Sequence, residues 1–376
     1  MPKKIKVCQD GYTIRHATLK VRLYPTPVQA ELFEKTFGCC RYIWNQMLSD
    51  QERFYLETGA HFIPTPAKYK KGAPFLKEVD NQALTQEYNK LSQAFRVFFK
   101  HPETFGHPNF KKKKTDRDSF TACNHEFESG PTIYITKDGI RMTKAGIVKA
   151  KFSQRPKAWW KLRRITVSKT RTGTYYCSIL YEYQVKESKH VPPTPETTLG
   201  LKYSAGHFYV ADNGTKADPP HWLEQSQEKL VKLQRKLSRM EPDSKNYQET
   251  VQKYRLLHEH IANQRRDFLH KESSRIANGW RAVCIRSDDL QELGLTAGFG
   301  AFRKMLRYKL EWQGKSLISI DRYFPSTRFC SVCGHLADEI DYSRQTWTCP
   351  KCGTLLDREI NAAKNIKSEG LAHFCA

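Results

Sequence analysis

The spacing of hydrophobic positions predicts a strand-rich first half that is interrupted by helices. Apolar residues alternate over 14–24 as in a strand, and from Pro27 they recur at the spacing of a helix. A second helix is predicted over 81–100, and the Pro-, Lys- and Gly-rich residues 63–74 predict a loop between the two helices. Strand-like runs return at 120–121, 133–135, 165–167 and 175–181. Strands on both sides of the helices predict one β-domain with a helical insert.

The second half begins after a proline-rich linker at 191–198. Residues 198–214 alternate as two strands joined by a small-residue turn, which predicts a hairpin. Residues 222–280 predict a long, highly charged helical hairpin, either a solvated structural element or one that braces nucleic acid. Further along, the pattern predicts strands at 283–285 and 316–320 and helices at 302–312 and 355–366.

Charge indicates the class of partner. The chain has 376 residues, 39% of them apolar, so two or three domains with real cores are expected. The formal net charge of +24 favours a polyanion, and nucleic acid fits better than a membrane surface. No stretch approaches ~18 consecutive apolar residues, and residues 1–10 are basic with no apolar segment behind them. We therefore expect a cytoplasmic protein that does not bind membranes.

Four of the eleven cysteines have the spacing of a zinc ribbon, and the other seven form no recognisable framework, which favours a reducing compartment. Cys330 and Cys333 form one pair and Cys349 and Cys352 the other, each followed by a glycine that permits a tight turn. Four thiolates satisfy the tetrahedral preference of Zn²⁺ and leave no open position, so a structural zinc is predicted. The alternatives are two chance pairs or a redox site.

Three C-terminal segments resemble a known family. They are YFPSTRFCSVCG at 323–334, TWTCPKCG at 346–353 and DREINAAKNI at 357–366. Together they resemble the C-terminal half of TnpB proteins, the transposon-encoded RNA-guided nucleases that are ancestral to type V CRISPR effectors. VRLYPT at 21–26, GHPNFKKK at 106–113 and QRRDFLHK at 264–271 resemble the same family, so the resemblance extends over nearly the whole chain.

The resemblance implies an α+β multidomain protein with guide RNA and double-stranded target DNA as partners, in a bacterial, nucleoid-associated setting. In its first half the resemblance implies a β-barrel-like wedge domain at 1–26 and 108–192, with a helical recognition domain inserted at 27–107. In its second half it implies an RNase H-like (RuvC) α/β core at 193–329 that contains the helical hairpin 222–280. A zinc ribbon at 330–353 and the C-terminal helix of the core at 354–376 are expected to follow.

The family's nuclease chemistry needs three carboxylates that hold two Mg²⁺ ions. By the resemblance, the first aspartate corresponds to Lys202 in Gly-Leu-Lys, the second acid to Asp288 and the last to Asp357. The charge changes from about −3 to about −1, and an ammonium has no lone pair for a metal, so Mg²⁺ is not expected there. Asp212 or Asp218 could instead replace the lost acid. Asp357 could serve as a helix N-terminal acid or pair with Lys202.

Basic and polar residues are candidates for nucleic-acid contacts, although runs of charge are often only solvated surface. The candidates for contacts to the backbone of guide RNA or heteroduplex are Lys111, Lys112, Lys113, Lys114, Arg163 and Arg164. The two arginines lie close in sequence to Trp159 and Trp160. The resemblance also implies that a short duplex motif is recognised between the recognition helices and the wedge. The candidates for contacts to base edges are Asn81, Thr85, Gln86 and Thr121.

The sequence thus predicts a nuclease-dead TnpB-like protein that represses transcription by holding an R-loop. One alternative is an active metal-dependent RNA-guided DNA endonuclease with an atypical set of acids. The other is a guide-RNA-binding transposition accessory protein without its own DNA target. Cleavage with a matched guide separates the first two, and absence of DNA binding identifies the third.

Overall fold

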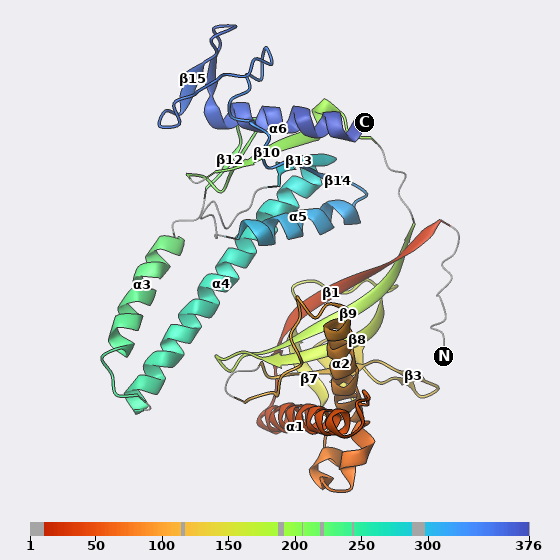
Figure 1. The fold of residues 1–376 in the computed structure, drawn as a ribbon. Coiled ribbons are helices and arrows are strands. Elements are labelled where there is room, and N and C mark those ends of the chain that lie inside the picture. Colours follow the sequence, from red (N-terminus) through yellow and green to blue (C-terminus); the bar gives the residue numbers. More distant parts are fainter. Residues whose placement is uncertain are drawn as a thin grey trace. The chain divides into compact units, whose positions relative to one another are not determined.

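The computed structural model describes residues 11–113, 117–186, 192–204, 206–218, 222–242, 244–287 and 298–375 (Figure 1). The chain forms two compact units, Met1–Lys186 and Glu187–Ala376. None of the described helices is both long enough and apolar enough to cross a membrane.

A seven-stranded sheet is the framework of the first unit. Its order is β2 (Ser119–Cys123), β8 (Lys161–Lys169), β9 (Tyr175–Lys186), β1 (Tyr12–Tyr24), β7 (Gly146–Lys151), β6 (Gly139–Met142) and β5 (Tyr134–Ile135). Strand β1 pairs antiparallel with β9 from Tyr12 to Leu23, so the start of the chain is bound to strands that follow the helices. A small separate hairpin consists of β3 (Glu126–Phe127) and β4 (Gly130–Pro131).

Two long helices lie between β1 and β2, as the hydrophobic pattern predicts: α1 (Pro27–Thr58) and α2 (Asn81–Lys100). Helix α1 begins at a capping box, in which Thr26 Oγ1 accepts from the Gln29 N–H and Gln29 Oε1 accepts from the Thr26 N–H. Phe33 and Phe37 pack against Phe120 of β2, so helices and sheet share one core. The predicted loop 63–74 is instead partly helical, with short 3₁₀ turns at Pro66–Lys70 and Pro74–Lys77.

The second unit is built on a five-stranded sheet. Its order is β12 (Lys216–Ala217), β11 (Tyr209–Ala211), β10 (Thr198–Tyr203), β13 (Ala282–Arg286) and β14 (Ser316–Ile320). Strands β10, β13 and β14 are parallel, whereas β10, β11 and β12 are antiparallel. The hairpin predicted within 198–214 is therefore confirmed. The 3₁₀ turn Pro195–Thr197 precedes β10.

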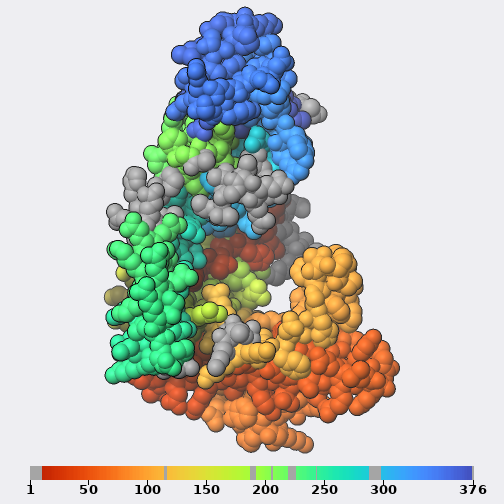
Figure 2. Space-filling model, turned by 60° about the vertical axis from the view of Figure 1, so that its left-hand side comes forward, coloured from red at the N-terminus to blue at the C-terminus, as the bar shows by residue number. Residues whose placement is uncertain are grey.

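Among the described residues, four helices accompany this sheet: α3 (Trp222–Leu237), α4 (Lys245–Gly279), α5 (Phe299–Trp312) and α6 (Arg358–Cys375). Helices α3 and α4 form the predicted charged hairpin and lie side by side (Figure 2). Ser244 caps the start of α4, with its Oγ accepting from the Tyr247 N–H. Strands β15 (Thr346–Thr348) and β16 (Leu355–Asp357) form a two-stranded ribbon that leads directly into α6.

The two faces of β10 have different partners. Leu199, Leu201 and Tyr203 belong to the core with α5, where the Tyr203 and Phe299 rings lie 4.8 Å apart. The opposite face is covered by α6 (Figure 1). A Cβ on Gly200 would lie 2.1 Å from the Ala363 carbonyl oxygen, so helix and strand touch backbone to backbone.

This close approach makes Gly200 a stability determinant. We expect Gly200→Ala to lower the free energy of unfolding by about 2 kcal/mol or more, because the new methyl collides with a helix backbone that cannot move alone. Thermal unfolding should show a melting temperature lower by roughly 4–8 °C. Gly300→Ala is the control, since a Cβ there has no neighbour within 4 Å and α5 gains helix propensity. Equal melting temperatures for the two variants would contradict this account.

Candidate functional site

The packing of α6 determines which of its side chains faces Lys202. Gly200 lies beneath Ala363 and Lys367, and Lys202 projects from the same face of β10 two residues further on. One helical turn before Ala363 is Glu359. Its Oε1 lies 3.6 Å from the Lys202 Nζ, and the two side chains are 18% (Lys202) and 13% (Glu359) exposed. Lys202, at the strand position where the resemblance implies an aspartate, therefore belongs to a largely buried ion pair.

Ser204 and two arginines also interact with the Lys202–Glu359 pair. Ser204 Oγ donates to Glu359 Oε1 at 2.7 Å, so this oxygen already has a hydrogen-bond donor. Burial lowers the pKa of Lys202, the Glu359 carboxylate opposes this shift, and Arg358 and Arg286 add to it. At 3.6 Å the ion pair is longer than an ordinary hydrogen bond. One carboxylate thus faces a mainly cationic surrounding.

Asp357 has a different role from the one expected of a metal-binding acid. Its Oδ1 accepts from the backbone N–H groups of Glu359 and Ile360, both at 2.9 Å, and this caps the start of α6. Its Oδ2 accepts from Gln345 Nε2 at 3.4 Å. The proposed role as a helix N-terminal acid is therefore confirmed. The proposed pairing with Lys202 is corrected, because Glu359 is the residue on the helix face that meets β10.

The two acids considered as replacements are engaged elsewhere. Asp212 accepts from the Gly200 N–H and from Lys367 Nζ, both at 2.9 Å. Asp218 pairs with His207. Asp288 lies outside the described residues, two positions after Arg286 at the end of β13.

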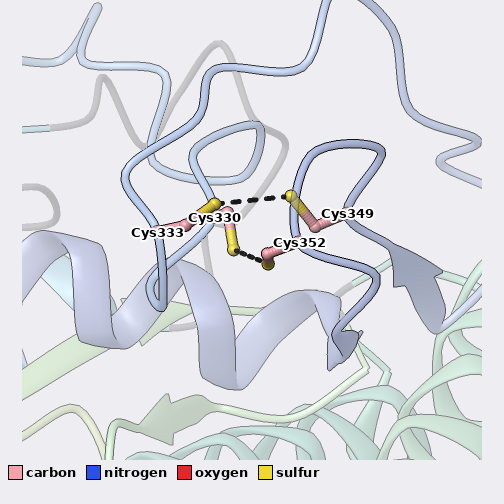
Figure 3. A group of neighbouring side chains, drawn as sticks. All are labelled: Cys330, Cys333, Cys349 and Cys352. Atoms are coloured by element: carbon pink, nitrogen blue, oxygen red, sulfur yellow. Dashed lines mark hydrogen bonds between the residues drawn. The ribbon is translucent and has the colours of Figure 1, made fainter.

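The four predicted zinc ligands lie together (Figure 3). All their Sγ atoms lie within 4.8 Å of one another, with Cys330 and Cys352 3.7 Å apart and Cys333 and Cys349 3.6 Å apart. A tetrahedral Zn²⁺ with bonds of about 2.3 Å separates its sulfurs by about 3.8 Å, so the cluster fits this ion. Cys352 Sγ lies 3.2 Å from Thr354 Oγ1, and hydrogen bonding with the side chain and backbone of Thr354 lowers the pKa of Cys352 to about 6.

The glycines after each cysteine pair form the tight turns that the spacing predicts. Gly334 and Gly353 both have φ of 71°, and their N–H groups donate to the carbonyls of Cys330 and Cys349 at 2.9 Å. Glycine is favoured here because other residues rarely adopt this backbone conformation.

Two asparagines on α6 attach the ribbon to the core, and sequence reasoning missed them. Asn361 Oδ1 accepts from the Ser331 N–H at 2.9 Å, and its Nδ2 donates to the Phe329 carbonyl at 2.6 Å. Asn365 Nδ2 donates to the carbonyls of Ser326 and Phe329 at 2.8 and 2.7 Å. Both side chains are buried. Their spacing of four residues on a predicted helix was the available signal.

The basic run 111–114 is only partly available for a nucleic-acid contact. Lys111 Nζ lies 2.5 Å from Glu87 Oε2 and 4.0 Å from the centre of the Trp44 ring, and Glu87 is fully buried. Lys90 Nζ lies 2.6 Å from Glu87 Oε1, so Lys111 and Lys90 share one buried acid, and the contact of Lys111 to a nucleic-acid backbone remains a prediction. Lys112 and Lys113 are exposed, and Lys114 lies outside the described residues.

Arg163 and Arg164, the two candidate arginines near Trp159 and Trp160, differ in their partners. Arg163 forms a fork with Glu182, with distances of 3.0 Å from Nε and 2.5 Å from Nη2. Arg164 is exposed, and its side chain has no hydrogen bond or ion pair among the described residues. Arg164 thus remains the more accessible candidate.

The four candidates for contacts to base edges also differ in their exposure and hydrogen bonds. Thr121 is buried and shares a hydrogen bond of 3.0 Å with Thr166 on β8, which corrects the expectation that it reaches base edges. Asn81 is exposed and accepts from Lys70 Nζ at 2.6 Å. Thr85 donates to the Asn81 carbonyl within α2, and Gln86 is half-buried on the same helix. Asn81, Thr85 and Gln86 remain predictions.

Comparison with family models gives three matches. Residues 299–366 match the Cas12f1-like TNB domain, residues 178–290 match a model described as "Probable transposase" of the IS605 OrfB type, and residues 15–60 match a helix-turn-helix model of the same type. Over 15–60 this chain has strand β1 followed by one continuous helix, so the name of that model does not describe its local fold.

Relatives match over nearly the whole chain. One is a "Putative RNA-guided DNA endonuclease" of Streptomyces pristinaespiralis, 30% identical over 94% of this chain and 89% of the relative. Another is the "Putative RNA-guided DNA endonuclease InsQ" of Escherichia coli K12, which is 26% identical over 95% of this chain and 93% of the relative. The fold is similar to that of Cas12f1 in its complex with sgRNA and target DNA, with a TM-score of 0.60 and 11% identity. The match covers 95% of this chain and 99% of the Cas12f1 chain.

The cysteine cluster gives a direct prediction. Cys349→Ser should release bound zinc and loosen residues 330–353, because the ribbon has few apolar residues to hold it without a metal. Cys123→Ser is the control, since that thiol lies outside the cluster. Metal analysis should find about one zinc in the reduced unmodified protein and in the control. Absence of zinc from the unmodified protein would overturn this assignment.

Proposed function

This chain belongs to the TnpB (IS605 OrfB) family, and we propose that it is an RNA-guided DNA-binding protein without nuclease activity that represses transcription. The observation that supports this most is the buried ion pair of Lys202 and Glu359. By the resemblance the strand position would hold a metal-binding aspartate, and the acid that faces it from α6 is Glu359 rather than Asp357, the residue to which the motif match assigned the last acid.

The ion pair opposes metal binding in two ways. The ammonium has donors only, so Lys202 cannot be a ligand, and Glu359 is already held by Lys202 and Ser204. A Mg²⁺ ion about 4 Å from the ammonium would experience a repulsion on the order of 8 kcal/mol at an effective dielectric constant of about 20. Arg286 and Arg358 act in the same direction. The described residues therefore do not fit the two-metal site of the family.

Target recognition in this proposal comes from the guide. Base pairing supplies sequence specificity, and the protein contributes cationic backbone contacts and recognition of a short duplex motif. The net charge of +24 and the exposed Lys112, Lys113 and Arg164 support such contacts. A bound complex that cannot cut would block transcription where the target overlaps a promoter.

An active endonuclease is the second candidate. The names of the relatives favour it, and Asp288 together with Glu359 could supply two carboxylates if Lys202 moved away. A guide-RNA-binding accessory protein without a DNA target is the third candidate. The next two predictions separate the three.

The first prediction concerns guide dependence. Tight, sequence-specific DNA binding should appear only with guide RNA, and mismatches next to the short flanking motif should weaken it most, because pairing begins there. Gel-shift titration of matched and scrambled duplexes with guide-loaded protein measures this. Equal affinity for both duplexes would refute guided recognition, and no binding to either would favour the accessory protein.

The second prediction concerns cleavage. With matched guide and DNA, the unmodified protein should occupy its target in Mg²⁺ or Mn²⁺ without nicking either strand, and in cells it should reduce transcription from an overlapped promoter. Denaturing gels with each strand labelled measure nicking. Nicking that persists in Lys202→Ala and disappears in Glu359→Gln would instead establish the endonuclease. Asp357→Asn is the control, since that carboxylate caps α6.

A further inference from the structure

A cavity of about 640 Å³ opens on the first unit where β8 begins beside β9. Its lining residues are the aromatic Trp159 and Tyr183, the polar Lys161, Arg163, Glu182 and Gln184, and Ile14. A volume of this size lies in the range of small-ligand sites and can hold one nucleotide.

The aromatic part of the cavity is rigidly supported. Trp160 stacks on Tyr183, with ring centres 4.8 Å apart and planes 12° apart, and its ring also lies 5.6 Å from that of the buried Tyr181. Trp159 meets Tyr183 at 73°, with ring centres 5.3 Å apart, and is 54% exposed. The exposed indole of Trp159 offers a surface on which a flat ring can stack.

The polar part of the cavity offers both donors and acceptors in fixed positions. The fork between Arg163 and Glu182 orients both side chains, and Lys161 Nζ lies 2.8 Å from Glu126 Oε2. Gln184 is exposed and contributes an amide with both functions. Nucleobase edges present the same mixture of donors and acceptors, whereas a bare phosphate would select unpaired cations. Lys157 Nζ lies 5.4 Å from the centre of the Trp159 ring and adds positive charge beside the stacking surface.

We propose that this cavity binds one unpaired base of the guide RNA, stacked on Trp159 and hydrogen-bonded at its edge by Arg163, Glu182 and Gln184. The inference rests on the proposed function, which supplies an RNA partner. An unpaired RNA base fits better than target DNA, because proteins read RNA mainly by stacking splayed bases of loops and bulges on aromatic rings. The cavity would thereby fix the register of the guide on the protein.

The test uses the full-length protein and its co-purifying guide RNA. Trp159→Ala should weaken guide binding about 5- to 100-fold, the range expected for loss of one base–aromatic stack, while Trp159→Phe should retain most of the affinity. Chemical probing of the bound RNA should show one nucleotide that is protected by the unmodified protein and reactive with Trp159→Ala. Trp312→Ala is the matched control, because that indole is 46% exposed on α5 in the second unit.

Salt dependence distinguishes stacking from a general electrostatic contact. Trp159→Ala should leave the slope of log affinity against log salt unchanged, because no phosphate contact is removed. Unchanged RNA affinity and probing pattern in Trp159→Ala would overturn the proposal, and so would a loss confined to DNA binding. These outcomes are separate from failure of the proposed function, which would appear as absence of guided DNA binding by the unmodified protein.

Discussion

The backbone contact between α6 and β10 is the constraint on which the second unit depends. Gly200 allows Ala363 and Lys367 to lie directly on the strand, and this fixes both the height and the rotation of α6. With that register fixed, Glu359 meets Lys202, Asn361 and Asn365 hold the ribbon, and Asp357 caps the helix. One helix thus connects the Lys202–Glu359 ion pair to the cysteine cluster.

This arrangement explains how a lysine can occupy the strand position without destabilising the core. An isolated buried ammonium would be costly, but Glu359 compensates its charge, and Ser204 satisfies the same carboxylate. In the proposed function, the ion pair would replace the electrostatic role of a bound metal by a fixed internal cation. Cleavage would then be lost while the scaffold is retained, which is the situation a guided repressor needs.

The sequence predicted most elements because their periodicity is strong, including the helix at 81–100 and the strand at 316–320. The cysteine spacing also predicted the cluster, since ligand geometry depends on local turns. It did not reveal that Glu359 faces Lys202, because that depends on the rotation of α6 over the sheet. Lys111 and Thr121 looked accessible as polar residues, yet the buried Glu87 and the cross-strand Thr166 engage them. Such long-range partners have no local signature in the chain.

Binding of Mn²⁺ to the RNA-free protein tests the central claim most directly, because it examines the site without the need for a guide or target. Electron paramagnetic resonance of titrated protein measures free and bound ion, and Glu359→Gln identifies binding at this site. We expect the unmodified protein and Glu359→Gln to give the same titration, with no tight site between β10 and α6. Tight Mn²⁺ binding by the unmodified protein that is lost in Glu359→Gln would contradict the account.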